Sequence, residues 1–129
     1  MVDHPLLGKK ILIAEDDFAN QKVASLYLQK IGCKTSVAEN GSEAVQMFLK
    51  DDYDLILMDC RMPVMDGLEA ARIIRESGAH NIPIIAMTAN IDSRDKRSCF
   101  EAGMNEFISK PVNLEQLQNT MKLLIDAKK

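Results

Sequence analysis

Four short apolar runs in this chain each end at polar or charged residues, and this pattern constrains the fold more than any other feature. The runs span 10–14, 55–58, 82–87 and 106–109, and they lead into Glu15-Asp16-Asp17, Asp59, Thr88 and Lys110. Apolar runs of this length suit strands that are buried on both faces, as in a parallel sheet. Because ligands bind at the carboxyl ends of such strands, we expect these side chains to share one crevice, with a composition that suits a divalent metal ion and a phosphoryl group.

Helical patterns lie between the apolar runs. They are predicted at 18–31, 42–49, 68–77, 91–102 and from Asn113, the expected N-cap of the last helix, toward the end of the chain. A weaker strand is predicted at 35–38, at the edge of the sheet, after a helix cap at Gly32. Strand and helix therefore alternate five times, which predicts an α/β fold, a (βα)5 three-layer sandwich with right-handed crossovers.

Two of the predicted helices have unusual patterns. The apolar residues of helix 18–31 cover an arc of roughly 200°, wider than the stripe of a little over ~100° that a surface helix usually buries. Either this helix is well buried, or part of its apolar surface is exposed for docking. Helix 91–102 is strongly polar, with Ile91, Cys99 and Phe100 as its few apolar anchors. We therefore expect it to be the least firmly held helix.

Length and composition favour a single soluble domain. The 129 residues suit one domain over 1–129, with a core at about 9–127 and no room for an output domain after the last helix. The net charge of -3 implies no strong attraction to nucleic acid or to an anionic membrane, and no apolar stretch approaches the ~20 residues of a membrane helix. The N-terminus lacks the layout of a signal peptide, and the three cysteines lack metal-type spacing. Buried thiols in a reducing cytoplasm are the simplest interpretation.

The residues at the strand ends also resemble a known family. Glu15-Asp16, the segment 58–67 (Met-Asp-Cys-Arg-Met-Pro-Val-Met-Asp-Gly), Met87-Thr88-Ala89 and Ser109-Lys110-Pro111 together resemble the receiver domains of two-component response regulators. The match covers nearly the whole chain in the right order and spacing. Residues 15–24 look more like receivers of hybrid sensor histidine kinases than like those of transcription factors. The resemblance implies a flavodoxin-like fold whose five-stranded parallel sheet has the order 2-1-3-4-5.

The resemblance also implies which residues carry the chemistry. Asp59 would be the phosphoacceptor, taking a phosphoryl group from a phosphohistidine of a histidine kinase or a histidine phosphotransfer protein. Asp16, Asp59 and the backbone carbonyl of Arg61 would bind Mg²⁺, for which Mn²⁺ could substitute, and Glu15 would act partly through water. Crowded carboxylates oppose one another's ionisation, and a divalent cation relieves that repulsion.

Further roles follow from the same resemblance. Thr88 and Lys110 would stabilise the phosphoryl group, Lys110 as a point charge and Thr88 through its hydroxyl. Thr88 and Phe107 would form a switch in which the threonine moves toward the phosphate and the aromatic ring turns inward. Arg61 and Asn90 occupy the positions that tune dephosphorylation in the family.

The function that these residues predict is phosphorelay signalling. Phosphorylation would switch the face around helix 91–102, strand 106–109 and the last helix. No multiple-turnover reaction is expected, and the switched face could support a phosphorylation-dependent dimer. The chain would be a cytoplasmic stand-alone regulator or the cytoplasmic receiver portion of a hybrid kinase, including one that is anchored in a membrane. Three alternatives remain open: a metal-dependent phosphohydrolase, although Asp59-Cys60-Arg61 breaks its usual Asp-x-Asp; a flavin-binding module, although 15–17 would repel its phosphate; and a docking-only pseudo-receiver.

Overall fold

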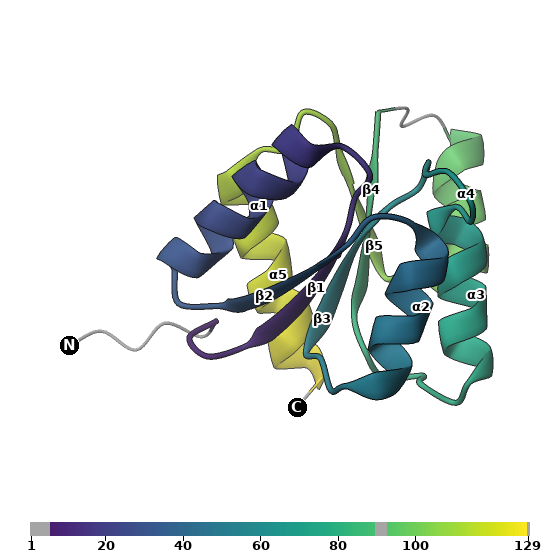
Figure 1. Ribbon diagram of the computed structural model, residues 1–129, viewed down its shortest axis with the longest axis horizontal. Helices are drawn as coiled ribbons and strands as arrows, with labels where there is room; N and C mark the ends of the chain where they lie inside the picture. Colours follow the sequence, from purple (N-terminus) through teal and green to yellow (C-terminus); the bar gives the residue numbers. More distant parts are fainter. Residues whose placement is uncertain (1–5, 90–92, 129) are drawn as a thin grey trace.

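The computed structural model describes residues 6–89 and 93–128, where five β-strands alternate with five α-helices (Figure 1). The elements are β1 (Lys10–Ala14), α1 (Phe18–Lys30), β2 (Lys34–Ala38), α2 (Gly41–Lys50), β3 (Leu55–Asp59), α3 (Gly67–Glu76), β4 (Ile84–Thr88), α4 (Ser93–Glu101), β5 (Glu106–Ser109) and α5 (Leu114–Lys128). The predicted (βα)5 order is therefore confirmed. The expected start of the fourth helix at Ile91 lies outside the described residues.

All five strands run parallel, in the order β2-β1-β3-β4-β5, as the family resemblance implied. The predicted edge position of β2 is confirmed. Figure 1 shows α1 and α5 on one face of the sheet and α2, α3 and α4 on the other. Because every strand points the same way, the carboxyl ends of β1, β3, β4 and β5 lie along one edge of the sheet, where the loops with the reactive residues begin.

The sheet has a separate apolar core on each face. Along β1, Ile11 and Ile13 belong to the core that includes Leu28 of α1, whereas Leu12 and Ala14 belong to the core of the opposite face. This alternation follows from the two-residue period of a strand. All of these side chains are fully buried, and burying one leucine or isoleucine contributes about 1.5–3 kcal/mol. The central strands are thus apolar on both faces, which explains their continuous apolar sequences.

Helix α1 covers the sheet with only part of its apolar surface. Leu28 is fully buried, but Phe18, Val23 and Leu26 are 70%, 56% and 60% exposed. The interpretation of the apolar arc as a well-buried helix is therefore wrong, and the alternative, an exposed apolar surface, describes the structure. Gly32 follows the helix at φ 97°, a left-handed conformation that glycine adopts without strain, which confirms the predicted cap.

Short polar side chains fix the helix starts next to the strand ends. In each case the side-chain oxygen accepts a hydrogen bond from the backbone N–H three residues later, at Asp17, Asn40, Asp66 and Asn113. The predicted N-cap at Asn113 is confirmed. Each such cap stabilises its helix by about 1 kcal/mol. Together the caps hold the loops at the carboxyl ends of the strands in defined positions.

Helix α3 begins unusually close to the end of β3. The backbone N–H of Gly67 donates to the carbonyl of Cys60 at 3.1 Å. A Cβ atom at position 67 would collide with the backbone oxygen of Asp59 and approach the Met58 Cγ atom to 2.8 Å. Glycine therefore lets α3 pack directly against the strand end that carries Asp59.

Gly67→Ala is expected to lower the free energy of unfolding by about 1–3 kcal/mol because the new methyl group overpacks against backbone. Alanine's better helix propensity alone would raise it by up to ~1 kcal/mol, so the sign of the change is decisive. Urea unfolding measures it. Arg72→Ala, at an exposed position of the same helix, is the control and should change stability by no more than about 0.5 kcal/mol. A stabilised Gly67→Ala variant would contradict the close approach.

Candidate functional site

The ends of the two central strands β1 and β3 bring three carboxylates together. Glu15 and Asp16 follow β1, Asp59 ends β3, and one carboxylate oxygen from each lies within 4.8 Å of the others. Glu15 and Asp59 are buried, with 2% and 4% of their surface exposed, whereas Asp16 is exposed. Two buried carboxylates so close together require compensation, because an uncompensated buried charge is costly.

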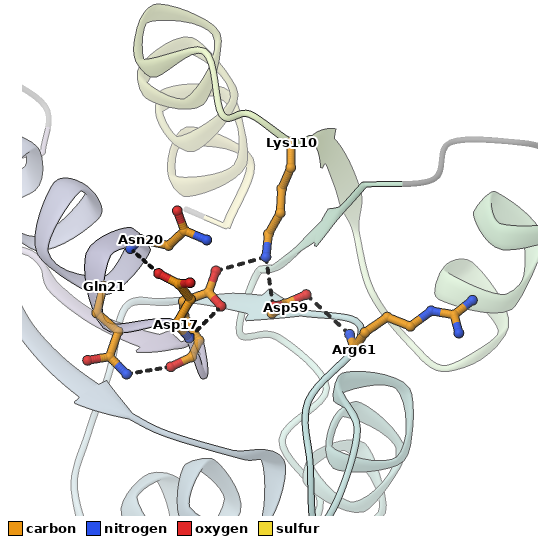
Figure 2. A network of polar contacts seen from close by, with 7 residues as sticks. Asp17, Asn20, Gln21, Asp59, Arg61 and Lys110 are labelled. Atoms are coloured by element: carbon orange, nitrogen blue, oxygen red, sulfur yellow. Dashed lines mark hydrogen bonds and ion pairs between the residues drawn. The ribbon is translucent and has the colours of Figure 1, made fainter.

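Lys110 supplies this compensation from the loop after β5. Its Nζ atom lies 2.7 Å from Asp59 Oδ2 and 2.9 Å from Glu15 Oε1. Figure 2 shows the lysine reaching down from its loop to the carboxylate of Asp59. The backbone N–H of Lys110 donates to the Thr88 carbonyl at 2.8 Å, so the base of the side chain is also fixed to the sheet. One ammonium group thus bridges carboxylates from two different strands.

The bridge changes the titration of the lysine. Burial by itself lowers the pKa of Lys110, but the hydrogen bonds and charges of Asp59 and Glu15 outweigh burial and raise this pKa above its ordinary value. The ammonium group therefore stays charged throughout the neutral pH range. Lys110 pairs with two of the three clustered carboxylates, so the formal charge of the three carboxylates and the ammonium group together is negative.

Glu15 is held at both carboxylate oxygens. Oε1 pairs with Lys110, and Oε2 accepts a hydrogen bond from the Asp17 backbone N–H at 3.1 Å. Its backbone oxygen accepts a further hydrogen bond from the Gln21 side-chain amide at 2.6 Å (Figure 2). Asp17 itself caps α1 through Asn20 and is not one of the three clustered carboxylates. Glu15 therefore acts as a fixed anchor of the crevice, and Asp16 is the less constrained carboxylate.

Gln21 was not predicted from the sequence as a site residue. It lies one helical turn after the cap at Asp17, a position that points back toward the preceding strand end. A predicted helix start with its cap could have indicated this contact.

The residues after Asp59 fold back over its carboxylate. The backbone N–H of Arg61 donates to Asp59 Oδ1 at 3.1 Å, which places the backbone of residue 61 beside the acidic cluster. Its guanidinium group points away from the cluster in Figure 2. Carboxylate and backbone oxygens are the ligands that Mg²⁺ prefers. The cluster of carboxylate oxygens therefore fits a hard divalent cation.

Thr88 and Phe107 lie on the neighbouring strands. Thr88 ends β4, is 5% exposed, and lines a hollow of about 280 Å³ together with Cys60, Arg61 and Cys99. The β3–β4 register pairs Asp59 with Met87, the residue before Thr88, so the hydroxyl lies one strand over from the carboxylate.

Phe107 of β5 is half-buried under side chains of α4. Its ring packs edge-to-face with Phe100 at a centroid distance of 6.3 Å, and Lys96 Nζ lies 4.7 Å from the ring centre. A strand residue thus contacts the helix that was expected to be weakly held. The predicted rate-tuning residue Asn90 lies outside the described residues.

The comparison with protein families identifies this class of site. The family model of the response regulator receiver domain matches residues 11–122. This chain belongs to that family, and it is a receiver domain of two-component phosphorelay signalling. None of the helices in the described part of the chain is long and apolar enough to cross a membrane.

The curated relatives are much longer proteins. Hybrid signal transduction histidine kinase K of Dictyostelium discoideum is 46% identical over 127 residues, covering 92% of this chain and 10% of that protein. Histidine kinase 5 of Arabidopsis thaliana is 37% identical, covering 88% of this chain and 15% of that protein. The chain thus spans only 5% to 15% of the length of such relatives. The predicted likeness to receivers of hybrid kinases is confirmed.

Two solved structures are also similar to this chain. The receiver domain of a sensor histidine kinase from Pseudomonas aeruginosa, with a magnesium ion coordinated in its active site cleft, is 39% identical with a TM-score of 0.86, covering 92% of this chain and 98% of that one. A Saccharomyces cerevisiae receiver domain, crystallised with the histidine phosphotransfer protein upstream of it, is 33% identical with a TM-score of 0.84. The match covers 90% of this chain and 88% of that one.

Lys110→Met is expected to lower the free energy of unfolding at pH 7 by about 1–3 kcal/mol, because two buried carboxylates lose their counter-ion. The loss is below the 3–5 kcal/mol of a fully buried pair because the lysine side chain is 21% exposed. The folded state raises the pKa of Lys110. The contribution of the Lys110 ion pairs to stability is therefore complete below the pKa of lysine in the unfolded chain, about 10.4, and it disappears as the pH rises through the higher pKa of the folded state.

Denaturant unfolding of the wild type and of Lys110→Met, between pH 7 and alkaline pH, measures the difference in their free energies of unfolding. Lys10→Met is the matched control, because Lys10 pairs with a single carboxylate, Asp51, at the surface, where ion pairs contribute little. Equal losses for the two variants at pH 7, or a Lys110→Met difference that does not shrink at alkaline pH, would contradict this account of the bridge.

Proposed function

We propose that Asp59 is the phosphoacceptor of this receiver domain. The observation that carries the proposal is a buried carboxylate at the end of a central strand, paired at 2.7 Å with an ammonium group and clustered with two further carboxylates. Asp16, Asp59 and the backbone carbonyl of Arg61 bind Mg²⁺ in this proposal. Glu15 acts through water, since protein donors already engage both of its carboxylate oxygens. The magnesium ion named for the P. aeruginosa receiver supports this assignment.

The reaction forms one bond and breaks another. A carboxylate oxygen of Asp59 attacks the phosphorus of a phosphohistidine, the P–N bond breaks, and the imidazole leaves with its electron pair. The Lys110 ammonium group, which pairs with the Asp59 carboxylate before transfer, pairs with the phosphoryl oxygens afterwards. The Thr88 hydroxyl donates a hydrogen bond to one of these oxygens. Bound Mg²⁺ supplies neutralisation of the remaining phosphoryl charge. Phosphoryl transfer requires mainly placement and charge compensation, which the fixed strand ends supply.

The phosphorylated state then changes one face of the domain. In this proposal Thr88 moves toward the phosphoryl group, and Phe107 turns inward together with its contacts on α4. Arg61 and Asn90 tune the rate at which water removes the phosphoryl group from Asp59. The domain catalyses its own phosphorylation and dephosphorylation, without turnover of an external substrate.

The donor is a histidine phosphotransfer protein or a histidine kinase, and the exposed part of α1 is its docking surface. Phe18, Val23 and Leu26 form an apolar surface on α1, and a groove of about 530 Å³ lined by Val23 extends from it to Glu15 and Lys110. A partner seated on this surface would bring its phosphohistidine to the mouth of the crevice. The co-crystal of the yeast receiver with a histidine phosphotransfer protein supports this class of partner.

Asp59→Asn is expected to abolish phosphorylation. Incubation with acetyl phosphate or phosphoramidate should add one phosphoryl group to the wild type when Mg²⁺ is present and none when it is chelated, because the carboxylate is both nucleophile and ligand. Intact-mass spectrometry measures the adduct. Asp17→Asn is the matched control and should retain the adduct, because Asp17 caps α1 outside the cluster. Retained labelling of Asp59→Asn, or continuous release of phosphate from phosphate esters, would overturn the proposal.

Leu26→Lys is expected to slow phosphoryl transfer from a phosphorylated histidine phosphotransfer protein by about tenfold or more, because a charge replaces an apolar contact in the docking surface. Labelling by acetyl phosphate should stay unchanged, since this small donor needs no docking surface. Leu123→Lys is the control, because Leu123 on α5 is also an exposed apolar residue, at 72% against 60% for Leu26. Equal transfer rates for the two variants would place the docking surface elsewhere.

A further inference from the structure

Two cysteines that are far apart in the sequence contact each other between the end of β3 and α4. Cys60 follows Asp59, Cys99 lies on α4, and their Sγ atoms are 3.6 Å apart. Both residues are buried, at 8% and 2% exposure. A disulfide bond is about 2.05 Å long, so the sulfurs need to approach each other by about 1.5 Å to form one.

Both cysteines line the same hollow. This hollow has a volume of about 280 Å³, and Thr88 lines it as well. A water molecule occupies roughly 30 Å³ in the liquid, so a molecule as small as hydrogen peroxide fits this space. The two thiols therefore combine mutual contact with access for a reagent, a combination that a buried structural cysteine lacks.

We propose that Cys60 and Cys99 form an oxidisable dithiol, which a small peroxide converts into an intramolecular disulfide. In the first step one sulfur takes an oxygen from the peroxide and becomes a sulfenic acid, with release of water. In the second step the other sulfur displaces that hydroxyl group as a second water, and the S–S bond forms. Two S–H bonds and the O–O bond are lost, and the peroxide accepts two electrons and two protons. A thiol reductant reverses the reaction by exchange.

The disulfide would attach α4 to a rigid point of the sheet. The backbone N–H of Cys60 donates to Met87 on β4 at 3.0 Å, and its carbonyl accepts from Gly67 at the start of α3. Cys99 provides the buried attachment on α4, next to the exposed Phe100. Oxidation therefore restrains α4, and if α4 responds to phosphorylation as proposed above, oxidation opposes that response. The formation of the cross-link itself does not depend on the proposed function.

The third cysteine is an internal control. Cys33 belongs to the core on the opposite face of the sheet, and its Sγ atom lies 3.4 Å from the Leu6 backbone oxygen. Burial raises the pKa of its thiol to about 11, which keeps it protonated and unreactive at neutral pH. It has no route to either of the other two sulfurs across the sheet.

Treatment of the reduced chain with hydrogen peroxide, followed by alkylation, tests the proposal. Before alkylation, the oxidised protein should be about 2 Da lighter than the reduced protein. After alkylation, one cysteine should carry the label in place of three, and a non-reduced digest should contain a peptide that joins Cys60 to Cys99. Dithiothreitol should restore the original mass. Cys60→Ala and Cys99→Ala should each lose the cross-link, whereas Cys33→Ala should keep it, with circular dichroism confirming that each variant is folded.

Hydrogen exchange measures the restraint on α4. The amides of α4 should exchange more slowly in the oxidised wild type than in the reduced wild type, and the difference should disappear in Cys99→Ala. Oxygen adducts on single cysteines without a 60–99 cross-link would overturn the proposal, as would cross-links between molecules. Equal exchange in the two forms would overturn the restraint. These readouts require no phosphorylation, so a failure of Asp59 labelling leaves them interpretable.

Discussion

The crevice depends on one interaction, the pairing of the Lys110 ammonium group with two carboxylates. This group lies 2.7 Å from Asp59 and 2.9 Å from Glu15, two buried carboxylates that come from different strands. Without it, two negative charges would be buried side by side, an arrangement that proteins tolerate poorly. Because Lys110 follows β5, the charge balance at the central strands depends on the correct folding of the edge strand farthest along the chain. The bridge thus couples the site to the completeness of the sheet.

The rest of the crevice is arranged around this bridge by backbone constraints. The cap at Asp17 and the amide of Gln21 fix the segment at Glu15, and Gly67 allows α3 to begin directly against Asp59. The exposed carboxylate of Asp16 is available for the cation site proposed above. A receiver built in this way contributes placement and charge rather than a reactive cofactor, which suits phosphoryl transfer onto a carboxylate.

The hollow beside Thr88 connects the two parts of the molecule that signalling would couple. One of its walls is the end of β3, with Cys60 and Arg61, and another is α4, with Ser98 and Cys99. Movement of Thr88 and formation of a 60–99 disulfide would both act in this space. Phosphorylation and oxidation would therefore act on the same helix, one to move it and the other to hold it in place.

Local sequence patterns predicted the strands, the helices, the caps at Gly32 and Asn113, and the polar residues at the strand ends, because apolar period, turn residues and capping act over a few residues. The sheet order came from the family resemblance and agrees with the structure. Only the tertiary structure decided that Phe18 and Leu26 face solvent, that Lys110 bridges two carboxylates, and that Cys60 touches Cys99. These features depend on how crossovers bring distant segments together, and long-range packing leaves no periodic signal in the sequence.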